Sequence, residues 1–431
     1  MAFANKRGQL DDLALAVGSG DIGAVKVILF QSRDGKGRMD NRDAAGYTVL
    51  HVAAFRGHGA MVKLLLEAGA SMETRTADES RLLRGATKHE SGYTAGPIQL
   101  LLESGIAKHQ AMDASGDTAL HCTAEFGGVE AARVLLTAGA ERDARNRKNK
   151  TPLHRAVQHK SVQVVRLLLD AGADANARDK RHSTPLLGAL KYRPCENSAE
   201  IARALLAAGA DPSCRDRESV TPLQLAATGR DVAMVRALLE AGADTEAKDA
   251  NQETVLFSAI GAGGEGDVAM VRALLEAGAD TEAKDANQQT VLFSAIRARG
   301  HGVVRVLLEG GADAEARCMK GTTPLMRAAF EGDPLGLELL LLLGKGAAVD
   351  ARDRHDKTAL HWALSFGLDN DEQFPDEQFP EGEVEMRLEV VKLLVAKGAD
   401  VEARDMDDNT PLLAAVEYGG FWQVYLKPRI D

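Results

Sequence analysis

Aromatic residues are scarce in this sequence. Phenylalanine, tyrosine and tryptophan make up 4% of its 431 residues, while hydrophobic residues as a whole make up 45%. Alanine and leucine must therefore form most of the core. A long hydrophobic run is absent as well, because the longest leucine-rich stretch, LGLELLLLLGKG at 335–346, is interrupted by Gly336 and Glu338. It is shorter than the roughly 20 residues that cross a bilayer, so it predicts a buried helix and no membrane span.

Cysteine is sparse too, and its pattern excludes two kinds of site. The four cysteines are far apart, form no CxxC pair and have no histidine at metal-ligand spacing; they are Cys122, Cys195, Cys214 and Cys318. We therefore expect no disulfide framework, no metal site and no cofactor. Free thiols fit a reducing compartment. The first residues, MAFANKRGQLDDLALAV, lack the apolar run of a secretory signal, so the sequence predicts a cytoplasmic or nuclear location.

An excess of positive charge is also missing. The formal net charge is −11, whereas nucleic-acid binding needs clustered Lys and Arg to displace phosphate counterions, so nucleic acid is disfavoured as a partner. No GxxxxGK, HExxH or GxSxG motif occurs. GAGGEG at 261–266 matches GxGxxG, but a dinucleotide site needs a preceding strand, and this segment lies between two predicted helices. These motifs therefore assign no catalytic residue and no nucleotide site.

One stretch of the sequence is present twice. The 22 residues DVAMVRALLEAGADTEAKDANQ at 231–252 return unaltered at 267–288, an offset of 36 residues. Both copies continue as TVLFSAI after a single mismatch, Glu253 against Gln289. Self-similarity at such a period is typical of proteins built from stacked supersecondary units, each of which buries its apolar face only against its neighbours.

Weaker copies of the same unit run along the chain. They begin with strings such as TVLHVAAFRGH (48–58), TPLHRAVQHKS (151–161) and TALHWALSFGL (358–368), and each continues with a second apolar segment that ends in GAD or similar letters. These strings resemble the TPLHxA signature of the ankyrin repeat, a unit of about 33 residues. The resemblance implies an all-α solenoid in which each repeat is a β-turn plus two antiparallel helices.

The local signals of one repeat agree with that fold. Thr151 is placed to cap the first helix, and Pro152 fits its first position, where a missing N–H has no cost. Gly172 stands where the second helix needs a left-handed residue to end. Apolar residues recur at helical spacing in both segments: Leu153, Ala156 and Val157 in the first, and Val162, Val165, Leu168 and Leu169 in the second.

The spacing of these strings predicts a single array over residues 6–431 with about twelve repeats. The first, third and last repeats depart from the pattern. Insertions include KYRPCENSA at 191–199 and a segment at 369–389 that holds nine acids and one Arg, in which DEQFP occurs twice in tandem at 371–380. Such a composition predicts an acidic loop between helices. The final letters, FWQVYLKPRID, are interpreted as a folded-back cap or, alternatively, as an exposed partner site.

In ankyrin repeats the two residues that end the first helix line a concave groove and contact partners. Six of the chain's 18 aromatic side chains occupy these positions, and aromatic residues carry much of the binding energy at interface centres. The alternative is that some of these rings pack under the next hairpin. Three other rings, at Phe257, Phe293 and Trp362, are predicted to be core. The resemblance implies partner contacts at Phe55, Arg56, Phe126, His159, Tyr192, Phe330, Phe366 and Tyr418.

Four histidines occupy the H of the TPLH-like string. A residue repeated at a fixed structural position is better explained by the fold than by chemistry, and in the ankyrin family this histidine bonds toward neighbouring turns. The resemblance therefore implies a structural role for His51, His121, His154 and His361.

Positive charge is concentrated in the middle of the chain. Residues 141–193 contain thirteen Lys or Arg and five acids. A partner with an acidic or phosphorylated segment would be steered toward such turns. The alternative is that these are only solvated turn residues. The predicted turn tips carry Arg147, Lys148, Lys180 and Arg181.

The sequence thus predicts a scaffold or adaptor that binds protein partners in its groove. The alternative is an ankyrin-fold protein that binds or transforms a small apolar molecule there, as a cyclase or hydrolase would. An open groove burying about 800 Å² per partner would favour the first, and a closed cavity of about 300 to 1,000 Å³ the second. The polar groups of the alternative would be Glu125, Arg155, His159, Tyr192 and Glu331.

Overall fold

The fold is known from a computed structural model. It describes the chain outside residues 1–9, 32–38, 42–46, 71–85, 87–94, 105–109, 192–195, 261–264, 344–346, 365–380 and 419–431. The chain divides into two compact units, Met1–Arg217 and Glu218–Asp431.

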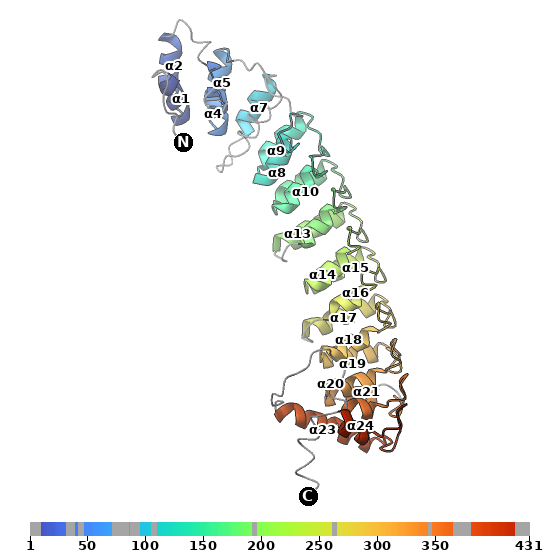
Figure 1. Ribbon diagram of the computed structural model, residues 1–431. Helices are drawn as coiled ribbons and strands as arrows, with labels where there is room; N and C mark the ends of the chain where they lie inside the picture. Colours follow the sequence, from blue (N-terminus) through green and yellow to red (C-terminus); the bar gives the residue numbers. More distant parts are fainter. Residues whose placement is uncertain are drawn as a thin grey trace. The chain divides into compact units, whose positions relative to one another are not determined.

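The first unit is a stack of helix pairs (Figure 1). First helices pack on first helices and second helices on second helices, as α8 does on α10 and α9 on α11. The pairs are α1 (Leu10–Ser19) with α2 (Ile22–Gln31), α4 (Val49–Phe55) with α5 (Gly59–Glu67), α8 (Ala119–Phe126) with α9 (Val129–Thr137), α10 (Pro152–Gln158) with α11 (Val162–Asp170), and α12 (Pro185–Lys191) with α13 (Glu196–Ala207); α7 (Ala95–Glu103) lies between α5 and α9.

The second unit repeats this plan. Its pairs are α14 (Pro222–Thr228) with α15 (Val232–Glu240), α16 (Val255–Ala259) with α17 (Glu265–Glu276), α18 (Val291–Arg297) with α19 (His301–Glu309), α20 (Pro324–Glu331) with α21 (Pro334–Leu343), and α22 (Ala359–Leu364) with α23 (Glu381–Ala396), followed by α24 (Pro411–Tyr418). The part of the chain that the structure describes contains no β-sheet, only an isolated bridge between Lys284 and Thr290. The predicted all-α fold of stacked helix pairs is confirmed.

Local signals set the ends of these helices as the sequence predicts. The Thr151 hydroxyl accepts a hydrogen bond from the His154 backbone N–H at the start of α10, and Pro152 occupies the first turn. Helix α11 ends at Asp170, and Gly172 follows with φ +79°. The predicted apolar edge of α10 is buried at Leu153, Ala156 and Val157.

Successive hairpin tips are joined by backbone hydrogen bonds. The Arg147 N–H donates to the Ser115 carbonyl at 3.0 Å, and the Lys180 N–H donates to the Lys148 carbonyl at 3.1 Å. Gly116 has φ +75°, and a Cβ there would lie 2.9 Å from the Arg147 nitrogen, so only glycine allows this approach. In the second unit Met319 donates to Asn287, Arg354 to Lys320 and Met406 to His355. The spacing of the tips is therefore fixed by the backbone.

The acidic insertion is only partly a loop. Residues 381–389 belong to α23, so the prediction of a loop is wrong for this part, while 369–380 lie outside the described residues. The helix is stabilised because Arg387, 5% exposed, donates to the carbonyl oxygens of Phe330 at 2.9 Å and Ala363 at 3.4 Å. The end of the 191–199 insertion is likewise helical, in α13.

The atypical repeats fall partly outside the described residues. The third repeat is described at Ala86 and α7, and the last ends its description with α24, so residues 421–431 are not described. The prediction of a single array with about twelve repeats therefore stays a prediction. No described helix has the length and apolar character needed to cross a membrane.

Candidate functional site

The basic hairpin tips of the first unit are exposed. Arg147, Lys148, Lys180 and Arg181 lie on two successive tips, joined by the backbone bond from Lys180 to Lys148. A further bond, from the Arg145 guanidinium to the Arg178 carbonyl at 3.1 Å, also holds the two hairpins together. Within the described part of the chain, the four tip side chains make no hydrogen bond or ion pair. Their charges are therefore presented to solvent from an ordered backbone.

Four predicted groove residues of the first unit are exposed at the ends of first helices. Phe55 ends α4 with 49% of its surface exposed, and Phe126 ends α8 with 41% exposed. His159 caps the C-terminus of α10 and is exposed, as is Arg56 after Phe55. Because α8 packs on α10, Phe126 and His159 occupy corresponding positions on neighbouring helices.

An ion-pair cluster in the same unit is centred on Arg155 of α10. Its guanidinium contacts the Asp117 carboxylate at 2.6 Å and the Glu125 carboxylate at 3.7 Å. Asn146 also donates to Asp117 at 2.7 Å. Burial alone would raise the pKa of Asp117, but the hydrogen bonds from Asn146 and Arg155 outweigh it and hold that pKa below its ordinary value. Asp117 therefore stays ionised as the partner of Arg155.

This cluster bears on the catalytic alternative. Arg155 and Glu125 are brought together as predicted, but with Asp117 as the nearer partner of the guanidinium, so both charges are engaged inside the fold. Glu331, of the second unit, pairs with Arg327 at 2.5 Å. Tyr192 lies outside the described residues. Asp117 and Asn146 were not singled out from the sequence, since nothing local links them to Arg155.

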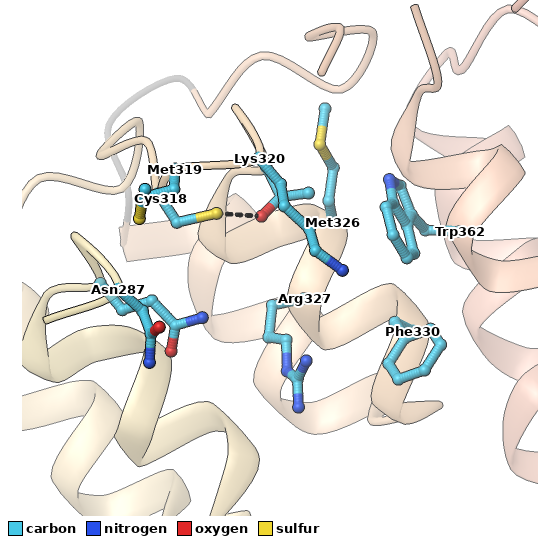
Figure 2. Close-up of a pocket in the computed structure, with 10 residues that line it drawn as sticks. Asn287, Cys318, Met319, Lys320, Met326, Arg327, Phe330 and Trp362 are labelled. Atoms are coloured by element: carbon cyan, nitrogen blue, oxygen red, sulfur yellow. Dashed lines mark hydrogen bonds between the residues drawn. The ribbon is translucent and has the colours of Figure 1, made fainter. Parts of the chain in front are cut away.

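The second unit contains a pocket beside α20 and α22 (Figure 2). It is lined by Phe330 of α20 and Trp362 of α22. Its volume is about 260 Å³. The rings of Phe330 and Trp362 meet edge to face with centroids 5.6 Å apart, and the Arg327 guanidinium carbon lies 5.4 Å from the centre of the Phe330 ring. The opposite walls are formed by the hairpin tips at Asn287 and Met319.

Of the three rings predicted to be core, two are buried and one is not. Phe257 and Phe293 are buried, as predicted for core residues. Trp362 is half-exposed in the pocket wall, so its prediction as core is wrong, because its indole points toward the space beside Met326 and its N–H donates to Asp353 at 3.0 Å. Met319 was missed from the sequence, although a 55% exposed methionine at a tip is an unusual place for an apolar side chain.

Three of the four histidines of the TPLH-like strings make the contacts expected of a structural residue. In α10 the Thr151 backbone N–H donates to His154 Nδ1 at 3.2 Å, so Nε2 carries the hydrogen and donates to the Ser183 carbonyl of the next hairpin at 3.1 Å. Burial is the main reason that the pKa values of three of these imidazoles lie below the ordinary value, which keeps them neutral. His121, His154 and His361 make the same pair of contacts.

Some predicted positions cannot be compared with the structure. Tyr192 and Phe366 lie outside the described residues, and Tyr418 ends α24 with an undescribed side chain. Their role in binding stays a prediction.

Comparison with protein families bears on the whole array. The family model described as ankyrin repeats (3 copies) matches residues 83–179, 189–285 and 262–353, and the model of a single ankyrin repeat matches 45–77 and 355–406. The chain belongs to the ankyrin-repeat family. Ankyrin-repeat arrays present extended concave binding surfaces and mediate protein–protein interaction, so protein partners are implied.

Similar curated proteins share only segments with this ankyrin-repeat chain. The transient receptor potential cation channel subfamily A member 1 homolog of Caenorhabditis elegans is 34% identical over 99 residues, which is 23% of this chain and 8% of that protein. The neurogenic locus Notch protein of Drosophila melanogaster is 31% identical over 126 residues, 29% of this chain and 4% of that protein. The human ankyrin repeat domain-containing protein 39 is 40% identical over 58 residues, 14% of this chain and 30% of that protein. The aligned segments thus span less than a third of each relative.

Proposed function

We propose that this ankyrin-repeat protein is a recognition scaffold whose first unit binds a protein partner through an acidic or phosphorylated segment. The partner contacts the basic tips, defined as Arg147, Lys148, Lys180 and Arg181, and the exposed ring of Phe126 in the neighbouring groove.

The observation that carries this proposal is the placement of the four tip cations. They are exposed, they make no ion pair among the described residues, and the backbone bond from Lys180 to Lys148 fixes one tip against the next. The ordered backbone lowers the entropy that binding must overcome. Exposed cations held at fixed spacing attract an anionic segment and orient it.

The internal pairing of Arg155 also supports the basic tips as the cations that contact the partner. The Arg155 guanidinium is engaged by Asp117 at 2.6 Å, whereas the four basic-tip side chains are exposed and make no ion pair among the described residues. Phe126, 41% exposed at the end of α8, offers apolar contact area in the same unit. An acidic segment with an apolar residue fits this combination better than a neutral small molecule.

A defined acidic probe tests the proposal. Fluorescein-labelled deca-glutamate is titrated with the full chain, and its anisotropy is followed at low and at about physiological ionic strength, where screening sets in beyond about 8 Å. We expect saturable binding that weakens with salt. Replacing the four basic-tip residues by glutamate should weaken binding at least tenfold.

A matched control separates the tips from net charge. Four exposed arginines on second helices, changed to glutamate, alter the net charge by the same amount: Arg203, Arg236, Arg272 and Arg305. This variant should bind within about twofold of the wild type, since its substitutions lie away from the basic tips. Equal loss in both variants, or no loss in the tip variant, would contradict the proposal.

A further inference from the structure

We propose that the pocket of the second unit is a separate peptide-binding site. Its occupant is a linear segment of a partner protein that inserts one aromatic or long aliphatic side chain against Phe330 and Trp362 and carries carboxylates beside it. All the pocket residues lie in the second unit, so the proposal stands apart from the function assigned to the basic tips.

The walls of the pocket favour an apolar side chain. Phe330 and Trp362 are half-exposed and meet edge to face, and Met319 and Met326 line the same space (Figure 2). The Trp362 N–H is already bonded to Asp353, so the indole offers its apolar surface. Methionine adapts its shape to different guests and makes favourable contacts with rings. Such walls bury an inserted ring or aliphatic chain well.

The size of the pocket limits what it holds. Its volume of about 260 Å³ is below the range of about 300 to 1,000 Å³ typical of small-molecule sites. It nevertheless far exceeds the roughly 10 to 15 Å³ of cavity volume that a single water molecule requires. A single large side chain, delivered by a peptide that continues along the surface, matches this volume better than an independent ligand.

The charges around the pocket favour carboxylates on the peptide. The acids nearby are engaged: Glu331 pairs with Arg327 at 2.5 Å, and Asp353 is 7% exposed and accepts the Trp362 N–H. Among the residues that line the pocket, Arg327 and Lys320 are cations and none is a carboxylate, and Lys320 is exposed. Positive charge is therefore what this rim presents to solvent, and an acidic peptide complements it.

Polar groups for a peptide backbone are also present. Asn287 is exposed and Gln289 half-exposed on the hairpin that forms the opposite wall. Their backbone N–H groups donate to Asp285 at 2.8 Å each, which fixes the hairpin. A side-chain amide both donates and accepts, so these two side chains can pair with the N–H and C=O of an extended peptide.

The pocket carries its own reporter. The chain has two tryptophans, at positions 362 and 422, so Trp422→Phe leaves the indole of the pocket wall as the only one. The full chain with this change is titrated with the pentapeptide EEFEE, acetylated and amidated, which contains no tryptophan or tyrosine. We expect a saturable change in tryptophan emission. EEAEE should bind at least tenfold more weakly than EEFEE because it lacks the ring. QQFQQ keeps the ring but has no charge, so it should bind more weakly than EEFEE at low salt and equally well at high salt, where charges are screened.

Two methionine variants provide the matched comparison. Met319→Glu places a negative charge in the pocket wall at a residue 55% exposed, so the fold should tolerate it. Met406→Glu makes the same change at a residue 66% exposed on another hairpin tip, outside the pocket lining. With far-UV circular dichroism unchanged in both, the first should weaken EEFEE binding at least tenfold and the second less than twofold.

The chain itself contains acidic segments with phenylalanine, the tandem DEQFP at 371–380, and a further variant tests whether they compete. This variant replaces 371–380 by ten glycine and serine residues. Binding of EEFEE to both chains, with loss in Met319→Glu, supports the proposal. Binding only after the replacement would make this chain's own segment the occupant and overturn it, as would absence of a saturable signal in both chains or equal loss in the two methionine variants.

Discussion

The guanidinium of Arg155, in the first helix α10, lies 2.6 Å from the carboxylate of Asp117, which belongs to the hairpin before α8 and is 6% exposed. The bond joins one repeat to the preceding one. Asn146 donates to the other oxygen of Asp117 at 2.7 Å. The carboxylate is thus held between two successive repeats, and its removal from water is offset only while both donors are in place.

Arg155→Ala should therefore destabilise the first unit. The change leaves Asp117 buried with one donor fewer, and breaking such a pair costs about 2 to 4 kcal/mol, allowing for the partial exposure of Arg155. We expect a lower urea midpoint for the first unit, measured by hydrogen exchange of its amides so that each unit is followed separately.

The second substitution Asp117→Asn should recover part of that loss. It removes the unpaired charge while keeping a polar group for Asn146. If Arg155→Ala alone leaves the midpoint unchanged, the ion pair contributes nothing measurable and the cluster around Asp117 holds without it.

Much of the fold followed from local signals in the sequence. The N-terminal threonine of a first helix and the glycine after a second helix act within a few residues, as Thr151 and Gly172 do, so the helix pairs could be predicted. The extension of α23 could not, because Arg387 is bonded to carbonyls 24 and 57 residues away in sequence. Partners at such separations leave no local pattern.

The candidate sites divide in the same way. The basic tips were predictable because turn residues are exposed wherever they occur. The pocket was not, since whether Trp362 is covered depends on how close the tip at Met319 stands to α22, and that is set by the hydrogen bonds between hairpins. A ring inside a first helix looks like core in the sequence whether or not the neighbouring hairpin covers it.

The buried histidines predict a loss of stability in mild acid. Burial lowers the pKa values of His121, His154 and His361 in the folded chain, while the unfolded chain keeps about 6.5. As pH falls through about 6.5, the unfolded state takes up protons that the folded state does not, so stability falls with it. The cost at pH 5.5 is limited to about 1.4 kcal/mol for each histidine, because that pH lies one unit below the pKa of the unfolded chain. Urea midpoints at pH 7.5 and 5.5 measure the effect.

Glutamine offers a control that does not titrate. Gln224 occupies the same position in α14, where its side-chain oxygen accepts from the Thr221 N–H at 2.9 Å and its amide donates to the Glu253 carbonyl at 3.1 Å. Replacing the three histidines by glutamine should keep both contacts and reduce the difference between the two pH values. An unchanged difference would assign the acid sensitivity to other groups.

The duplicated segment predicts that one repeat can be removed without disturbing the sequence pattern of the array. Deleting residues 231–266 joins Arg230 to Asp267. The repeat stays continuous, because the segment that then follows Arg230, residues 267–288, is identical to the original 231–252. Met234, Val235 and Leu238 are buried in α15 as their counterparts are in α17, and α14 would meet the VLFSA of α18 in place of that of α16. Each repeat contacts only its neighbours, so the shortened array should fold.

The measurements for this deletion are helix content per residue and peptide binding. Far-UV circular dichroism per residue should be unchanged, and EEFEE should bind as to the full chain, because Asn287, Phe330 and the rest of the pocket are kept. The matched control deletes 231–272, which joins Arg230 to Ala273 and leaves only Ala273–Glu276 of α17 as the second helix. This off-register chain should lose cooperative unfolding, since its second helix can no longer cover α14. If both deletions behave alike, then the identity of the two copies is not what makes neighbouring repeats compatible.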